Sequence, residues 1–162
     1  MEKVAIYPGS FDPVTNGHLD IVERGLTIFD KIIVAIMHNP AKKSLFSIEE
    51  RLEMLEISMG NFERVEFESF DGLTVDYAAR KKAHAILRGL RAVSDFEYEF
   101  QMALMNRRLN REVQTLFLMT GLRWIFTSSS IIKEAARFGG NIEDMVPLTV
   151  NEKIKEKFEK IP

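Results

Sequence analysis

The stretch VAIYPGSFDPVTNGH, residues 4–18, passes from an apolar run into a loop held by prolines and glycines and then into a helix start. Its first part, Val4 to Tyr7, is apolar and partly β-branched, which is typical of a strand. A helix is expected to begin near Asn16 or Gly17, because the next apolar residues then fall on one helical face. Those residues are Ile21, Val22, Leu26 and Phe29.

The same alternation of strand and helix continues along the chain. Further strands are predicted at Ile32 to Met37, Val65 to Phe70, Ala85 to Leu87 and Thr115 to Met119. Ser47 with Glu50 is a capping-box pair and predicts the start of a second helix. A third helix is expected over Thr74 to Lys82, and a fourth begins at Asp95. A fifth begins within Ser128 to Ser130 and ends before the Gly139-Gly140 pair, and the tail forms a last helix whose apolar face is Ile154, Phe158 and Ile161.

Strands that alternate with helices indicate an α/β fold with a Rossmann-like, doubly wound sheet. We expect a five-stranded parallel sheet in the order 3-2-1-4-5, with helices on both faces and a C-terminal helical tail. No repeat, low-complexity segment or linker divides the sequence, so residues 1–162 are expected to form a single domain. Ligands of such sheets bind beyond the carboxyl ends of the strands, which directs attention to the loops after strands.

Composition excludes several classes of protein. The chain has no cysteine, so disulfides and thiolate chemistry are ruled out. A net charge of −2 argues against a broad nucleic-acid surface, and no apolar run reaches the roughly 18 residues of a membrane span. We therefore expect neither nucleic acid nor membrane as a partner. The short apolar stretch near the N-terminus does not resemble a secretory signal, and a cytoplasmic location is expected.

The loop of residues 7–18 is a candidate anion site. It leads into a helix N-terminus, where unpaired N–H groups and the helix dipole attract phosphate, and Gly17 leaves room for close approach. His18 lies three residues before Ile21, which places its ring on the inward face of the first helical turn. The alternative, a histidine that merely caps a surface helix, is the commoner explanation for a lone histidine.

Two later segments follow strands in the same way. Arg88-Gly89-Leu90-Arg91 has two guanidinium groups flanking a glycine, a pattern suited to bidentate phosphate contacts. The segment 124–133 has four consecutive hydroxyl residues, 127–130, at a helix start. Lys42 and Lys43 add cations after the second strand. Each segment has a simpler alternative. The arginines and the lysine pair could be solvated surface residues, and the hydroxyl residues could be ordinary N-caps. Together, the segments indicate a nucleotide polyphosphate and a second phosphorylated substrate on one sheet edge.

These segments resemble the HIGH-type nucleotidyltransferases, in which Thr15-Asn16-Gly17-His18 matches the T/H-x-G-H motif. Residues 7–13, the segment Arg88 to Glu99 and Ser128-Ser129-Ser130 are together similar to the phosphopantetheine adenylyltransferase family over nearly the whole chain. One position departs from the family pattern, because Ser10 stands where threonine is expected. The hydroxyl is retained, and so the expected role is retained.

The resemblance implies transfer of AMP from ATP to 4'-phosphopantetheine, which gives dephospho-coenzyme A and pyrophosphate. His18 would be the catalytic residue, at the α-phosphate. Mg²⁺ on the phosphates and a homohexamer are also implied. The helix from Asp95 has one apolar stripe at Phe96, Phe100 and Ala103 and a second at Tyr98, Met102, Met105 and Leu109. A hexamer would give the second stripe a surface to pack against. The implied substrate-binding residues are Ser10, Lys42, Thr74 and Arg88. The implied ATP-binding residues are Ser10, Phe11, His18, Gly89, Leu90, Arg91, Glu99, Trp124, Ile125, Phe126, Thr127, Ser128, Ser129 and Ser130.

Other activities share part of this pattern. A cytidylyltransferase or a nicotinamide mononucleotide adenylyltransferase would share the fold and the T/H-x-G-H loop, and the segment Arg88 to Glu99 separates this chain from them. An ATP-binding domain without turnover is a further alternative, although it has no need of a donor at the α-phosphate. A class I aminoacyl-tRNA synthetase is excluded by the chain length and the net charge.

Overall fold

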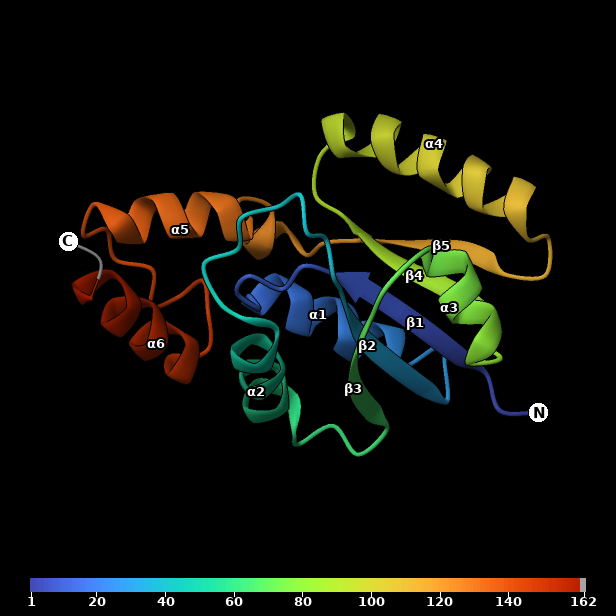
Figure 1. The fold of residues 1–162 in the computed structure, drawn as a ribbon, viewed down its shortest axis with the longest axis horizontal. Helices are drawn as coiled ribbons and strands as arrows, with labels where there is room; N and C mark the ends of the chain where they lie inside the picture. Colours follow the sequence, from blue (N-terminus) through green and yellow to red (C-terminus); the bar gives the residue numbers. More distant parts are fainter. Residues whose placement is uncertain (161–162) are drawn as a thin grey trace.

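The first strand, β1 (Val4–Gly9), lies at the centre of a five-stranded, all-parallel sheet in the computed structural model, which describes residues 1–160 (Figure 1). The strand order is β3-β2-β1-β4-β5, as predicted. The other strands are β2 (Lys31–Met37), β3 (Val65–Phe70), β4 (Ala85–Leu90) and β5 (Gln114–Met119). The predicted third strand matches β3 at both ends.

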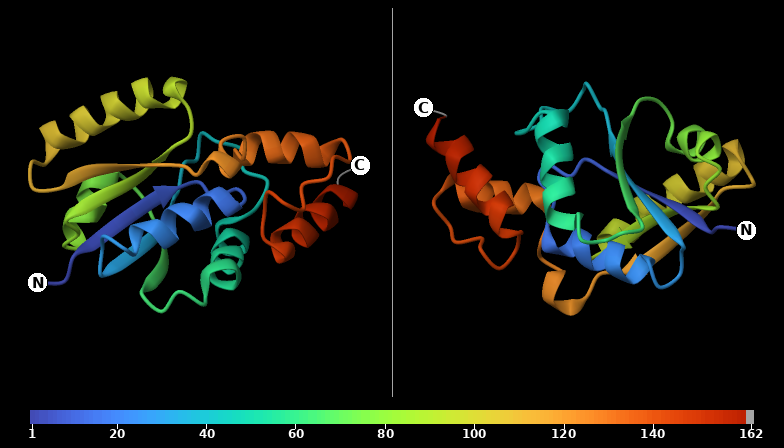
Figure 2. Two further views of the ribbon diagram at one scale, coloured as in Figure 1. Left: turned by 180° about the vertical axis from the view of Figure 1, so that it is seen from behind. Right: turned by 90° about the horizontal axis from the view of Figure 1, so that it is seen from below.

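Helices follow each strand and continue beyond the sheet. They are α1 (Asn16–Gly25), α2 (Ile48–Met59), α3 (Thr74–Arg80), α4 (Val93–Leu109), a short 3-10 helix η1 (Leu122–Trp124), α5 (Ser129–Arg137) and α6 (Leu148–Glu159). α5 and α6 lie side by side at the end of the molecule toward which β1 points (Figures 1 and 2). The predicted tail helix is α6, with Ile154 buried, and Ile161 lies outside the described residues. None of the helices described is long and apolar enough to cross a membrane.

Both faces of the sheet are covered, as predicted. Side chains alternate across a strand, so neighbouring residues of β1 enter different cores. Ala5 and Tyr7 belong to a core shared with α1, α2, α5 and α6, whereas Val4 and Ile6 belong to a core shared with α3. The central strand is therefore buried on both sides, which explains its nearly continuous apolar sequence.

The helix starts follow the predicted chemistry. Ser47 and Glu50 form the capping box of α2, in which each side chain accepts a hydrogen bond from the other's backbone N–H at 3.2 and 2.7 Å. Thr15 caps α1, and Ser128 caps α5. These caps fix the N-terminal ends of α1 and α5, which are the ends that point into the candidate site.

Several predicted boundaries were wrong. β1 continues through Gly9 instead of ending at Tyr7, because Pro8 and Gly9 pair with β2, and α3 ends at Arg80 instead of Lys82. β4 continues through Leu90 instead of ending at Leu87, because Arg88, Gly89 and Leu90 pair with three residues of β5. Gly89 marks close packing of α1 on the strand and not a loop, since a Cβ there would lie 3.1 Å from the Ile21 side chain. α4 begins at Val93, before the predicted Asp95.

α4 is a helix whose side chains are largely exposed to solvent. It runs above β4 and β5 in Figure 1, and within the described part of the chain none of its side chains is buried. Phe96 contacts Phe100 and Phe117, yet both Phe96 and Phe100 remain nearly half exposed. The two apolar stripes predicted on this helix are therefore left largely uncovered in a single chain.

Candidate active site

A cavity of about 460 Å³ opens at the carboxyl ends of β1 and β4. The loop after β1, the end of β4 and the start of α5 meet there, which is the edge of the sheet that the sequence indicated. The predicted site residues that line it are Ser10, Phe11, His18, Arg88, Gly89, Arg91, Glu99, Thr127, Ser128, Ser129 and Ser130.

Six predicted residues do not line this cavity. Leu90 is buried in β4, and Trp124, Ile125 and Phe126 lie in η1 and just after it. Lys42 is exposed in the segment after β2, and Thr74 is the first residue of α3. Lys42 and Thr74 therefore lie on the segments that follow the neighbouring strands β2 and β3, toward one side of the cavity.

His18 is held by the loop that leads into its own helix. The Thr15 backbone N–H donates to His18 Nδ1 at 2.9 Å, and the His18 backbone N–H donates to Thr15 Oγ1 at 3.3 Å. The ring also packs edge-on against Phe11, with 4.8 Å between ring centroids. Because Nδ1 accepts a hydrogen bond, the proton of the neutral ring resides on Nε2. His18 thus presents one N–H donor in a fixed orientation.

The charge state of His18 follows from its surroundings. Burial, reinforced by the guanidinium groups of Arg91 and Arg88, lowers the pKa of His18 from 6.5 to about 3. The ring is therefore neutral at physiological pH in the free protein. A neutral ring suits a hydrogen-bond donor better than a general acid, because it has no labile second proton to give.

This pKa predicts how the free protein responds to acid. The His18 ring resonances should not titrate between pH 8 and pH 5 in an NMR experiment, because the folded-state pKa is about 3. Unfolded chains take up this proton near pH 6.5, so the unfolded state binds more protons below that pH. His18 should therefore contribute a loss of stability as the pH falls from about 6.5 toward 3. A His18 titration midpoint between 6 and 7 would contradict this charge state.

Two arginines of the site are paired with acids of α4. Arg88 donates from Nε and Nη2 to the Glu99 carboxylate at 2.9 and 2.5 Å, and from Nη1 to the Pro8 carbonyl at 2.7 Å. Arg91 lies 3.3 Å from Asp95. Glu99 is only 12% exposed, so Arg88 is held in a fork geometry at the cavity wall.

The serine-rich segment supplies backbone donors more than hydroxyls. Ser128 Oγ accepts from the Ile131 N–H at 3.1 Å, and Ser129 Oγ donates to the Pro13 carbonyl at 2.7 Å. Thr127 Oγ1 donates to the Trp124 carbonyl at 2.7 Å. The first N–H groups of a helix have no intrahelical acceptor, so those of Ser129 and Ser130 are oriented for an anion.

Sequence reasoning missed several residues that shape the site. Asp95, Tyr98 and Thr120 line the cavity, and Asp12 and Arg51 are buried behind it. Arg51 of α2 donates to the carbonyls of Ser10 and Ser47 at 2.9 and 3.2 Å. The quoted first loop contains Asp12, but residue type alone does not reveal partners more than 30 positions away.

Metal-ligating groups are sparse among residues 1–160, where no three His, Asp or Glu side chains cluster as a metal site. The two carboxylates on the cavity wall, Asp95 and Glu99, are both paired with arginine. The cavity wall therefore presents cationic groups and helix N–H donors that suit an anion.

The chain is similar in sequence and fold to known nucleotidyltransferases. The model of the cytidylyltransferase-like family matches residues 6–135. A phosphopantetheine adenylyltransferase of Desulfosudis oleivorans is 70% identical, over 96% of this chain and 92% of that protein. One of Desulfatibacillum aliphaticivorans is 71% identical, over 97% of this chain and 90% of that protein. A Vibrio parahaemolyticus crystal structure assigned as a nicotinate-nucleotide adenylyltransferase covers 100% of this chain and 98% of its own, with a TM-score of 0.70 at 18% identity, which shows a shared fold.

Proposed function

The chain belongs to the cytidylyltransferase-like family and, within it, to the phosphopantetheine adenylyltransferases, and from this premise we propose how its residues divide the work of the reaction. The enzyme transfers AMP from ATP to 4'-phosphopantetheine, and gives dephospho-coenzyme A and pyrophosphate in coenzyme A biosynthesis. The proposal concerns the roles of individual residues, the metal ion and the assembly.

We propose that His18 stabilises charge on the α-phosphate as the acceptor phosphate attacks in line and pyrophosphate leaves. The observation that carries this proposal is the Thr15 N–H bond to Nδ1, which leaves Nε2–H as the donor of a neutral ring. The acceptor phosphate is already an anion at neutral pH, so no general base is required. Catalysis then rests on positioning and on preorganised donors.

The ATP polyphosphate would lie between α1 and α5. Arg91 would contact it from one side, and the free N–H groups of Ser129 and Ser130 from the other. The adenosine would lie near Gly89 and the segment 124–127, beside the N-terminus of α1. Gly17 lets this segment pack closely on the start of α1, since a Cβ there would lie 2.9 Å from Thr127 Oγ1.

The acceptor would enter from the side of β2 and β3. Arg88 and Ser10 line the cavity and would hold the 4'-phosphate, with Lys42 closing on it from the segment after β2. The pantetheine arm would then extend past Thr74. This direction is supported by the strand order, because on that side β2 lies next to β1 and β3 lies next to β2.

Mg²⁺ would arrive bound to ATP, since the described residues offer it no ligand cluster of their own. When bound, the ion supplies neutralisation of the polyphosphate charge. We further propose that the enzyme acts in the cytoplasm, where ATP is supplied.

The test of the whole proposal is to mix the protein with ATP, Mg²⁺ and 4'-phosphopantetheine and to follow the release of pyrophosphate and the formation of dephospho-coenzyme A. ATP binding without acceptor-dependent pyrophosphate release would refute it.

We propose that α4 forms the contact between subunits of a homohexamer. Its exposed apolar residues lie in a single element beside the site: Phe96, Tyr98, Phe100, Met102, Leu104, Met105 and Leu109. An apolar surface of this kind is unusual on a monomer and typical of an interface.

Charged substitutions on this face should disrupt the assembly. Met105→Glu combined with Leu109→Glu is expected to give a smaller species in light scattering coupled to size-exclusion chromatography, because two carboxylates would have to be buried unpaired. Ile57→Glu is the matched control, since Ile57 is equally exposed, at 52%, but lies on α2. An unchanged mass for the double variant, or an equal change for the control, would exclude α4 as the interface.

A further inference from the structure

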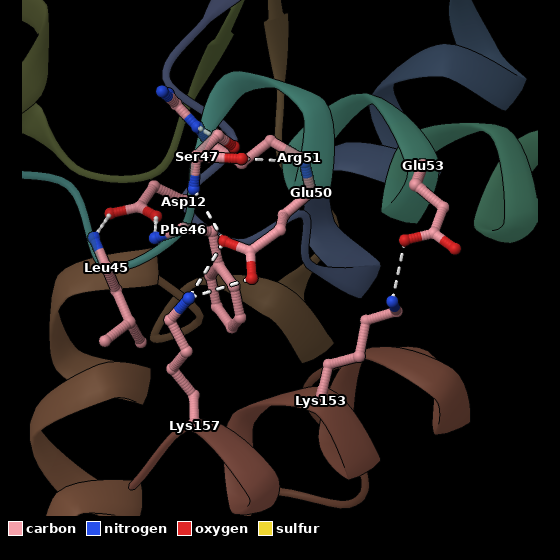
Figure 3. Close-up of polar contacts among 9 residues, drawn as sticks. All are labelled: Asp12, Leu45, Phe46, Ser47, Glu50, Arg51, Glu53, Lys153 and Lys157. Atoms are coloured by element: carbon pink, nitrogen blue, oxygen red, sulfur yellow. Dashed lines mark hydrogen bonds and ion pairs between the residues drawn. The ribbon is translucent and has the colours of Figure 1, made fainter. Parts of the chain in front are cut away.

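Asp12 is a buried carboxylate with three hydrogen-bond donors from two distant parts of the chain. Its side chain is 6% exposed. Oδ1 accepts from the Phe46 N–H at 2.9 Å, and Oδ2 accepts from the Leu45 N–H at 2.9 Å (Figure 3). Lys133 Nζ of α5 also donates to Oδ2, at 2.6 Å. Both oxygens and the charge are thereby satisfied, which a buried carboxylate requires.

The two backbone bonds fix one end of the segment that carries Lys42. This acceptor segment, residues 38–47, runs from the end of β2 to the cap of α2. β2 holds its first end in the sheet, and Asp12 holds Leu45 and Phe46 at its second end. Within the segment, the backbone bond from Lys42 to Asn39 is a local turn. Asp12 therefore fixes the second end of the segment, three to four residues after Lys42, relative to the first loop.

The ion pair between Asp12 and Lys133 also connects the acceptor segment to α5, which carries proposed ATP-binding residues. Lys133 lies one helical turn after Ser129 and Ser130, on the helix whose N-terminus faces the cavity. Ser129 Oγ donates to the Pro13 carbonyl, so α5 contacts the first loop at two successive residues. Asp12 consequently joins the acceptor segment, the first loop and α5, although neither Asp12 nor Lys133 lines the cavity.

We propose that Asp12 and Lys133 are positioning residues, which hold the acceptor segment in register with the ATP-binding end of α5. Their effect on the reaction passes through Lys42, which they place relative to the α-phosphate. This inference rests on the proposed roles of Lys42 and of α5. Loss of this link should affect the alignment of the two bound substrates for reaction more than the affinity for either one. A misplacement of the reacting groups by about 1 Å can lower the rate about a hundredfold.

The experiment compares Lys133→Met with Lys133→Arg, and adds Asp12→Asn. Lys133→Met removes the charge but keeps the length of the side chain, whereas Lys133→Arg keeps a donor for Asp12. The matched control is Lys153→Met, which breaks the partly exposed 2.8 Å pair between Lys153 and Glu53 of α2 (Figure 3). For each variant, kcat, both KM values, the Kd for ATP without acceptor, and the melting temperature are measured.

For Lys133→Met and Asp12→Asn we expect kcat/KM for 4'-phosphopantetheine to fall by about 10- to 100-fold, with the Kd for ATP changed by less than about threefold. Lys133→Arg should recover most of the loss, and Lys153→Met should behave as the parent enzyme. A lower melting temperature with unchanged kinetics would overturn the proposal, as would a rise in the Kd for ATP as large as the loss in kcat/KM for the acceptor, or no rescue by arginine. If Asp12→Asn fails to fold, the two Lys133 variants decide the matter. Absence of turnover by the parent enzyme would instead refute the proposed function.

Discussion

Replacing His18 with alanine is expected to lower kcat by about two to three orders of magnitude, on the scale of losing one preorganised donor to a developing oxyanion. The affinity for ATP should change by only a few fold, because the donor contributes mainly in the transition state. The reason lies in the geometry of the free protein. Thr15 N–H holds Nδ1, and the neutral ring needs no proton transfer or reorientation before it donates from Nε2.

The control for this experiment is His18→Gln. A glutamine side chain offers a carbonyl oxygen that can accept from the Thr15 N–H and an amide nitrogen that can donate, which reproduces the pattern of the neutral ring. We expect it to regain part of the lost kcat. Steady-state kinetics with saturating substrates, together with a thermal melt to verify folding, provides the measurement. Near-normal kcat in His18→Ala would remove His18 from the mechanism.

Most of the fold could be predicted because the burial of strands in a parallel sheet is visible in the sequence as short apolar runs. A strand buried on both faces is apolar along its length, which made β2 recognisable at nearly every residue. β3 lies at the edge of the sheet and was recognisable instead from the alternation of Val65 and Phe67 with Glu66 and Glu68. β4 was the exception, since its last residues are Arg88 and Gly89 followed by Leu90. Functional side chains at the end of that strand replaced the apolar ones that would have extended the pattern.

The cavity wall was likewise predictable, because backbone and side-chain donors for phosphate follow strands in recognisable patterns. The supporting layer was not predictable. Asp12 accepts hydrogen bonds from the N–H groups of Leu45 and Phe46, and Arg51 donates a hydrogen bond to the carbonyl of Ser10. Every residue type offers the same backbone groups, so no side-chain pattern at residues 45 and 46 identifies such a partner. Only the packing of α2 and α5 against the first loop reveals these contacts.

Arg88→Ala is expected to impair the use of 4'-phosphopantetheine strongly and also to destabilise the protein. Arg88 makes two hydrogen bonds to Glu99, and the Glu99 side chain is 12% exposed. Without Arg88 that carboxylate remains desolvated and unpaired, which should cost roughly 2–3 kcal/mol, less than the 3–5 kcal/mol of a fully buried pair. KM for the acceptor should rise by at least about tenfold, since a charged donor to the phosphate is lost.

Two further variants separate these effects. Lys42→Ala should raise KM for the acceptor without a change in stability, because the Lys42 side chain is exposed. Arg88→Ala combined with Glu99→Ala should recover stability relative to Arg88→Ala alone, yet leave acceptor use impaired. Chemical denaturation gives the free energies of unfolding, and calorimetry with each substrate gives the affinities. If ATP affinity collapsed in Arg88→Ala and Lys42→Ala while phosphopantetheine binding persisted, the two substrate positions would have to be exchanged.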